Sequence, residues 1–207
     1  MIKPTGCWTG HSDLLMSSSV DPGVGALVDR IKSPDETVSG AAWQSAGPYG
    51  AAAVQPLAAL MADEDFELAR KAKRALYLVV RHVGPPPAAK ERKAVERELI
   101  LVLESSPPRV RREVVWMLSE IGSARAIGPM AALLADKELR EDARCALTRH
   151  PSPDAVAALR SAFARAPRDF KYALAESLRE RGEKVAGYPS RKLVPTAETK
   201  VTPLKAK

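Results

Sequence analysis

Apolar residues recur at helical spacing along most of this chain, in groups that alternate between a first and a second helix. Spacings of three and four gather apolar side chains on one stripe of a helix. The first helices carry Val24/Leu27/Ile31, Val54/Leu57/Leu60, Leu99/Val102/Leu103, Ile127/Met130/Leu133 and Val156/Leu159/Phe163. The second helices carry Val38/Ala42/Ala46, Leu68/Ala72/Leu76, Val110/Val114/Leu118, Leu139/Ala143/Leu147 and Phe170/Leu174/Leu178. The pattern predicts a helix pair of about thirty residues that is repeated five times between residues 24 and 182.

A single short helix pair cannot hide both of its apolar stripes from water. Stacked pairs share one continuous core, so the stability of such a protein depends on the number of repeats. The sequence therefore predicts an all-α fold, an α-solenoid (α-α superhelix) of about five helix pairs over residues 21–182. We expect an irregular flank over residues 1–20 and an irregular basic tail over residues 183–207, where Gly and Pro are scattered among lysines.

Glycine and proline residues support the same helix boundaries. Pro56 and Pro129 each precede a first-helix apolar position, which predicts that they lie in the first turn, where proline removes no needed hydrogen bond. Gly122 and Gly182 follow second helices, as expected for helix ends. Residues 85–89 are rich in proline and are predicted to be an insertion that lengthens the second pair.

Two adjoining segments resemble the HEAT repeat, in particular the short bacterial type named after phycobilisome lyases. They are VRREVVWMLSEIG at residues 110–122 and AIGPMAALLAD at residues 126–136, and the resemblance extends over residues 24–182. The family is functionally mixed and includes scaffolds, adaptor subunits, bilin lyases and some DNA glycosylases. Membership therefore implies a fold and a concave groove lined by the second helices, but no single activity.

The resemblance also implies structural roles for some charged side chains. Asp63 with Arg70, and Asp136 with Arg140, are similar to the turn aspartate and second-helix arginine that brace neighbouring HEAT units. We expect Arg140 and Arg111 to brace the stack. Such exposed pairs contribute below about 1 kcal/mol each.

The net charge of +7 is unevenly distributed. Residues 183–207 hold six Lys and Arg side chains against two Glu, which leaves the repeats close to neutral. Attraction to nucleic-acid phosphates needs several clustered cations, so the charge gives only weak support for a dedicated nucleic-acid surface.

The second helices of the second and third pairs nevertheless present basic and aromatic side chains toward solvent. Arginine and aromatic residues dominate interface energetics because they combine a large contact area with a polar group. This pattern predicts a partner-binding patch, and a solvated face with one isolated Trp is the alternative. The predicted patch comprises Arg70, Arg74, Tyr77, Arg81, Arg112 and Trp116.

Trp116 and Glu120 lie four residues apart on one predicted helix face. They are similar to the tryptophan and carboxylate with which HEAT-like alkylpurine DNA glycosylases hold a cationic base. A carboxylate beside an indole can stabilise positive charge on a purine. Here the acid is Glu instead of the Asp of that family, and the later helices offer no second Trp.

No other catalytic, metal or cofactor motif is present. His11, His82 and His150 have no ligand spacing for a metal ion. Cys7 and Cys145 are too few and too far apart for a disulfide framework. The sequence contains no glycine-rich phosphate loop and no nucleophile elbow. We therefore expect no cofactor and no metal.

The sequence shows no secretory signal at residues 1–20 and no run of about eighteen apolar residues that could span a bilayer. We expect a soluble, cytoplasmic protein, and export stays open if the chain begins further upstream. The predicted function is a non-catalytic protein-interaction or scaffold module, a monomer or a subunit of a larger assembly, that binds a macromolecular partner, most simply another protein. The alternatives are a nucleic-acid-binding protein, such as an alkylpurine DNA glycosylase, and a lyase-type or adaptor subunit that acts on a partner protein.

Overall fold

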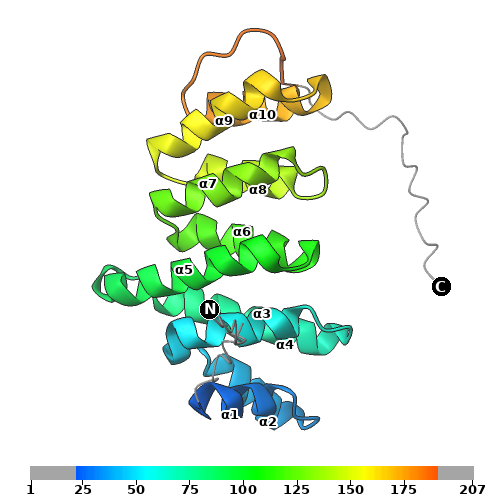
Figure 1. Cartoon of the computed structure of the whole chain (residues 1–207), viewed down its shortest axis with the longest axis vertical. Coiled ribbons are helices and arrows are strands. Elements are labelled where there is room, and N and C mark those ends of the chain that lie inside the picture. The colour runs from blue at the N-terminus through cyan, green and yellow to red at the C-terminus, as the bar shows by residue number, and fades with distance from the viewer. Residues whose placement is uncertain (1–21, 191–207) are drawn as a thin grey trace, which may run out of the picture.

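The structure, a computed structural model, describes residues 22–190, which form short helices stacked in one column (Figure 1). This part of the chain contains no strand. Three short 3-10 helices, Gly47–Ala53, Pro86–Ala88 and Leu133–Ala135, lie between or beside the α-helices. The α-helices are α1 (Pro22–Ile31), α2 (Glu36–Gln44), α3 (Val54–Met61), α4 (Phe66–His82), α5 (Ala89–Ser105), α6 (Pro108–Ile121), α7 (Ala124–Ala132), α8 (Arg140–Arg149), α9 (Pro153–Arg165) and α10 (Arg168–Glu180).

Consecutive helices form five pairs, from α1 and α2 at one end of the stack to α9 and α10 at the other (Figure 1). We number them pair one to pair five. Each first helix also contacts the first helix of the next pair, and each second helix contacts the next second helix. The predicted α-solenoid is therefore confirmed.

The core is a continuous cluster that runs through all five pairs, because the helices bury most of the apolar positions that their sequences predict. Leu27, Leu57, Leu99, Met130 and Leu159 form its first-helix row, and all are fully buried. Burial of one such side chain contributes about 1.5–3 kcal/mol relative to exposure, so the stripes supply the main driving force for stacking.

Side-chain caps fix several helix starts. The carboxylate of Asp35 accepts from the amides of Thr37 and Val38 at the start of α2, and Asp65 does the same at the start of α4. At the other end, α10 stops in a Schellman arrangement: the Glu183 amide donates to the Leu178 carbonyl, and the amide of Gly182 donates to Arg179. Gly182 has a φ of +85°, which a glycine adopts without strain.

Three expectations about boundaries and columns were wrong. In the apolar column of α2, Val38 is 39% exposed and Ser39 is fully buried in its place, whereas Ala42 and Ala46 are buried as predicted. A hydrogen bond explains this difference. The hydroxyl of Ser39 accepts from Lys71 of α4 at 3.0 Å and therefore faces the neighbouring helix. The predicted insertion at residues 85–89 is also shorter than expected, because α5 already begins at Ala89.

Pro129 lies inside α7 and not in its first turn. The helix begins earlier than the apolar column suggests, because the Ser123 hydroxyl caps it by accepting from the Arg125 amide at 3.3 Å. A proline at this depth removes the hydrogen bond to the residue four positions before it. The helix continues for one further turn and then tightens into the 3-10 segment Leu133–Ala135. Pro56, in contrast, lies in the first turn of α3, as predicted.

Residues 183–190 form neither helix nor strand and lie beside α10. The expected flank at residues 1–20 and residues 191–207 of the expected tail lie outside the described part of the chain. The domain boundaries at residues 20 and 183 therefore stay predictions.

Candidate partner-binding face

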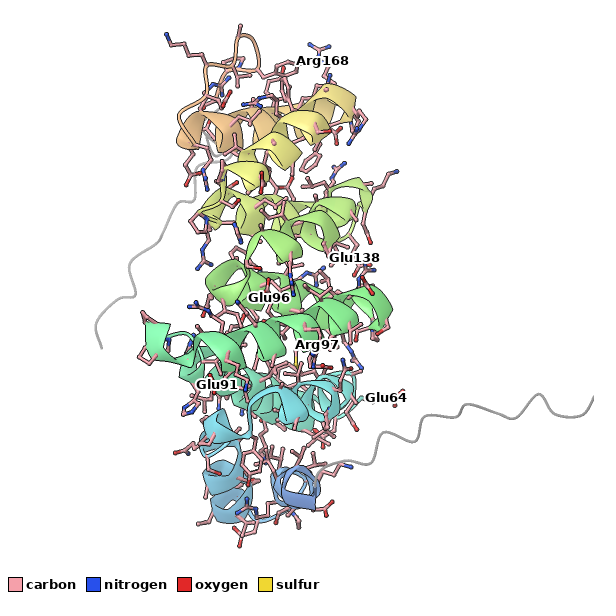
Figure 2. The ribbon with its side chains drawn as sticks, turned by 60° about the vertical axis from the view of Figure 1, so that its left-hand side comes forward. Glu64, Glu91, Glu96, Arg97, Glu138 and Arg168 are labelled. Carbon is pink, nitrogen blue, oxygen red and sulfur yellow. The ribbon has the colours of Figure 1, made fainter. Side chains whose placement is uncertain are left out.

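The turns inside the pairs collect along one edge of the stack, where Figure 2 labels Glu64, Glu138 and Arg168. Beside this edge run the second helices α2, α4, α6, α8 and α10, whose exposed side we call the second-helix face. All six residues of the predicted patch lie on two of its helices, α4 and α6, which contact each other. The structure therefore brings the patch together on neighbouring elements.

Four arginine side chains of the second helices lie over aromatic rings, and one of them, Arg140 of α8, lies 4.7 Å from the ring centre of Phe170. The guanidinium of Arg74 lies 5.5 Å from the ring centre of Trp43, and Arg81 lies 5.4 Å from that of Tyr77. Arg149 of α8 lies 5.4 Å from the ring of Trp116. A cation over an aromatic face is attracted by about 0.5–1 kcal/mol at exposed sites. These stacks hold long, otherwise mobile side chains in place along α2, α4, α6 and α8.

Trp116 and Arg112 share one carboxylate from the next pair. The indole Nε1 of Trp116 donates to Oδ1 of Asp142 at 3.1 Å, and Nε of Arg112 donates to Oδ2 at 3.0 Å. Arg112 also lies 3.6 Å from the Glu138 carboxylate. Asp142, which the sequence alone did not single out, therefore fixes two predicted patch residues at once.

Tyr77 is held by an acid on α6. Its hydroxyl donates to Glu113 Oε2 at 3.3 Å, and Lys73 donates to Oε1 of the same side chain at 3.2 Å. Burial, followed by the charge and hydrogen bond of Glu113, raises the pKa of Tyr77 well above its ordinary value. The phenol therefore stays protonated and remains a hydrogen-bond donor at any physiological pH.

Arg70 contacts Glu67, one turn before it on α4, and not Asp63 as expected. Its Nε is buried without a hydrogen-bond partner. A cavity of about 250 Å³ lies beside it, and Phe66 on its rim is 73% exposed. The apolar pattern gave no signal for Phe66, because the residue lies outside the buried columns at the first position of α4.

The two expected bracing arginines reach the next pair. Arg111 of α6 lies 3.8 Å from the Asp136 carboxylate in pair four and donates to the Leu103 carbonyl at 2.9 Å. Arg140 of α8 pairs with Asp169 of pair five at 3.0 Å, and not with Asp136. The hydrogen bond from Arg140 lowers the pKa of Asp169 below its ordinary value.

Arg74 and Arg81 are exposed and have no carboxylate within ion-pair distance among residues 22–190. Both are positioned only by the aromatic rings beneath them. Helix α4 carries five Lys and Arg side chains against one Glu. This helix is therefore the most basic element of the face, and two of its cations are oriented without being neutralised.

The pair Trp116 and Glu120 lies on α6, with Glu120 exposed at its end. The carboxylate that contacts the indole is that of Asp142, which Arg112 and Trp116 already occupy. The geometry thus adds no uncommitted acid beside the indole.

Among the remaining candidate residues, His150 has a structural role. His150 is buried and its Nδ1 accepts from the Ser152 amide at 3.2 Å, so Nε2 carries the proton and donates to the Gly122 carbonyl at 3.0 Å. Burial raises the pKa of the Cys145 thiol, which disfavours the reactive thiolate. His82 is exposed at the end of α4. The described residues contain no group of three potential metal ligands. His11 and Cys7 lie outside them.

The repeats, their stacking and this face define a helical-repeat protein of the solenoid class. The family model for HEAT repeats matches residues 95–179, so this part of the chain, from α5 into α10, is similar to HEAT repeats. No curated protein matches the sequence. None of the helices in the described part is both long and apolar enough to span a bilayer.

Several designed proteins of known structure are similar to the chain. One engineered protein from the Northeast Structural Genomics Consortium is 22% identical, with a TM-score of 0.39 and coverage of 76% of this chain and 78% of its own. A second from the same consortium is 18% identical, with a TM-score of 0.42 and coverage of 76% and 80%. A designed armadillo repeat protein in complex with the peptide (KR)4 is 18% identical, with a TM-score of 0.40 and coverage of 77% and 87%.

Proposed function

We propose that this protein is a non-catalytic HEAT-repeat interaction module, which binds an acidic segment of a partner protein across α4 and α6. The repeat fold commonly serves protein interaction. The observation that carries the proposal is the state of Arg74 and Arg81: both are exposed, held over aromatic rings and without an acid partner in the described part of the chain.

Pre-positioned cations favour an acidic partner for a physical reason. Binding normally costs about 0.5–1.5 kcal/mol for each long side chain that becomes immobilised. The rings of Trp43 and Tyr77 already restrict Arg74 and Arg81, so less of this cost remains at the moment of binding. A charge-assisted hydrogen bond from guanidinium to carboxylate then adds both affinity and specificity.

The test uses a fluorescent oligoglutamate peptide and the full-length protein at low ionic strength. We expect Arg74→Ala with Arg81→Ala to weaken the measured affinity by at least about tenfold, the equivalent of 1.4 kcal/mol. The helical circular dichroism should be unchanged, because both side chains are exposed and neither is part of the buried core. Anisotropy titration measures the affinity.

A matched control removes two exposed cations from first helices, Lys90 of α5 and Arg165 of α9. The Lys90→Ala and Arg165→Ala double variant loses the same charge and should bind as the unaltered protein does. Equal weakening by both double variants would show that only net charge matters, and it would reject a site on α4.

Binding of a labelled DNA duplex distinguishes a nucleic-acid partner from an acidic protein segment. If the duplex binds more tightly than oligoglutamate and the α4 variant loses it, the partner is a nucleic acid and not an acidic protein segment. A protein partner predicts the opposite order. For binding to DNA phosphates, the logarithm of the affinity falls linearly with the logarithm of the salt concentration. Titrations at several salt concentrations measure this slope.

A further inference from the structure

Residues 183–190 turn back from the end of α10 and lie against it as an irregular segment. The side chain of Arg179 holds their main chain: its Nη2 donates to the carbonyls of Gly187 at 2.9 Å and Tyr188 at 2.7 Å, with a longer contact to Val185 at 3.4 Å. The hydroxyl of Ser190 contacts the carboxylate of Glu176. One arginine and one glutamate of α10 therefore bind a short stretch of peptide largely through atoms that any sequence possesses.

The one aromatic side chain of this segment, that of Tyr188, packs between two other aromatic rings, which we call the aromatic slot. The ring of Tyr188 lies edge-on against Phe163 of α9, with centroids 5.4 Å apart, and against Tyr172 of α10 at 5.2 Å. Edge-to-face contacts of this kind add attraction beyond the buried area. The slot therefore selects an aromatic side chain.

The backbone of the segment is strained where the ring enters the slot. Tyr188 has a φ of +49°, in the left-handed region that side chains other than glycine rarely adopt, and Gly187 before it has a φ of +68°. The ring contacts and the Arg179 hydrogen bonds offset this strain. A competing segment that makes the same contacts without the strain would displace residues 185–190.

The segment covers the positions on α10 that correspond to the predicted patch on α6. In the aligned apolar columns, Tyr172 corresponds to Arg112, and Glu176 corresponds to Trp116. The same side of the second helices thus carries the basic and aromatic patch in pairs two and three and a bound peptide segment in pair five.

We propose that the surface formed by Phe163, Tyr172, Glu176 and Arg179 is a peptide-binding site, filled in cis by residues 185–190, where a partner segment carrying a Tyr or Phe takes their place. Arg179 binds the carbonyls of that segment, and the aromatic slot receives its ring. A cavity of about 360 Å³ beside Pro189 and Ser190, also lined by Tyr172, Ala173 and Glu176, leaves room for larger side chains after the aromatic residue. This inference extends the proposed interaction function to a second site with a different specificity.

The test uses a fluorescent peptide with the sequence of residues 183–190 and the full chain. In the unaltered protein, the tethered segment competes at an effective concentration in the millimolar range for so short a connection. Tyr188→Ala vacates the slot, so we expect it to bind the peptide at least about tenfold more tightly than the unaltered chain. Anisotropy titration measures both affinities.

Two controls define the site. A peptide with Ala in place of its Tyr should not bind Tyr188→Ala, and the double variant Arg179→Ala with Tyr188→Ala should lose the original peptide. Gly187→Val vacates the site by a second route, since Val disfavours the φ of +68°, and it should also raise peptide affinity.

Equal or absent peptide binding in the unaltered chain and in both vacated variants overturns the proposal and leaves residues 185–190 as a cap on the last pair. Binding that survives the Arg179→Ala change also overturns it. Arg74 and Arg81 lie on α4, so their double variant should bind this peptide normally. A negative result for the peptide site at pair five therefore does not contradict the acidic-partner proposal. A negative result for oligoglutamate on α4 likewise does not contradict the peptide site.

Discussion

At the scale of single residues, a few buried polar side chains join one pair to the next. Glu96 of α5 (Figure 2) is 3% exposed, and its Oε1 accepts from both the amide and the hydroxyl of Ser123, at 2.7 and 2.8 Å. Ser123 is the cap of α7, so an acid from pair three organises the start of pair four. Arg181 closes a similar link farther along, where it donates to the carbonyls of Thr148 and His150.

Glu96→Ala should lower the free energy of unfolding by about 2–3 kcal/mol, because it removes two hydrogen bonds that Ser123 donates to a charged, buried acceptor. Glu96→Gln retains one acceptor oxygen and should cost less. Urea denaturation followed by circular dichroism measures both values. Glu104→Ala is the matched control on the same helix, where the side chain is exposed, and it should change the value by less than about 0.5 kcal/mol. Similar losses from Glu96→Ala and Glu104→Ala would contradict the role of the buried contact.

These residue-level links were beyond the sequence pattern. A glutamate in the middle of a polar helix face looks like any solvated residue, and only the stacking of pair four over pair three buries Glu96. The same holds for Asp142, whose contacts with Trp116 and Arg112 join two pairs. The six patch residues could be named from the sequence because their spacing on α4 and α6 is local, whereas their partners on other helices could not.

At the scale of helices, the short link between α6 and α7 fixes how pair four meets pair three. Only Gly122 and Ser123 separate the two helices. A Cβ on Gly122 would press against the Leu118 carbonyl oxygen and lie 2.9 Å from the Ala126 Cβ. The carbonyl belongs to the last turn of α6 and accepts from the Gly122 amide at 2.8 Å, so it has little freedom to move away.

Gly122→Ala should therefore destabilise the protein by about 1–3 kcal/mol, the usual cost of forcing an extra methyl group into a packed site. Gly128→Ala is the matched control on α7, because nothing lies within 4 Å of its added Cβ. It should be neutral or stabilising by up to about 1 kcal/mol, since Ala favours a helix over Gly. Thermal melting of the two variants side by side checks the signs. Stabilisation by Gly122→Ala would show that the link is less crowded than its geometry indicates.

The helices themselves were predictable because their apolar columns follow a local period, as Leu99, Val102 and Leu103 do on α5. The ends of the helices were harder to predict from the sequence. The cap of Ser123 places Pro129 in the middle of α7, and in α2 it is Ser39, bound by Lys71, and not Val38 that faces the neighbouring helix. Both effects depend on polar side chains that compete with the hydrophobic pattern. Apolar burial therefore sets most positions of the columns, whereas individual hydrogen bonds set helix boundaries and the single column position of Ser39.

At the scale of the whole molecule, the described part of the chain is a one-dimensional array in which each pair contacts mainly its neighbours. Pair three has a pair on each side, whereas pair one has a neighbouring pair on one side only within the described part of the chain. Pair five is covered on its outer side by residues 183–190. Local stability should therefore differ along the array.

Hydrogen–deuterium exchange should reveal this gradient. We expect the amides of α6 to exchange slowest and those of α1 and α2 fastest, because local opening is easier where fewer neighbours must separate. Tyr188→Ala should speed exchange in α10 without affecting α1. Uniform protection from α1 to α10 would instead indicate a single cooperative unit.

The two tryptophans of the described chain lie under arginines on the second-helix face, Trp43 beneath Arg74 and Trp116 beneath Arg149. Indole emission responds to the charges and water around the ring, so each stack is a built-in optical probe. A ligand that draws either guanidinium away from its ring changes the emission of that indole, and the unlabelled protein thereby reports its own occupancy. Trp43→Phe and Trp116→Phe would assign the signal to α2 or to α6.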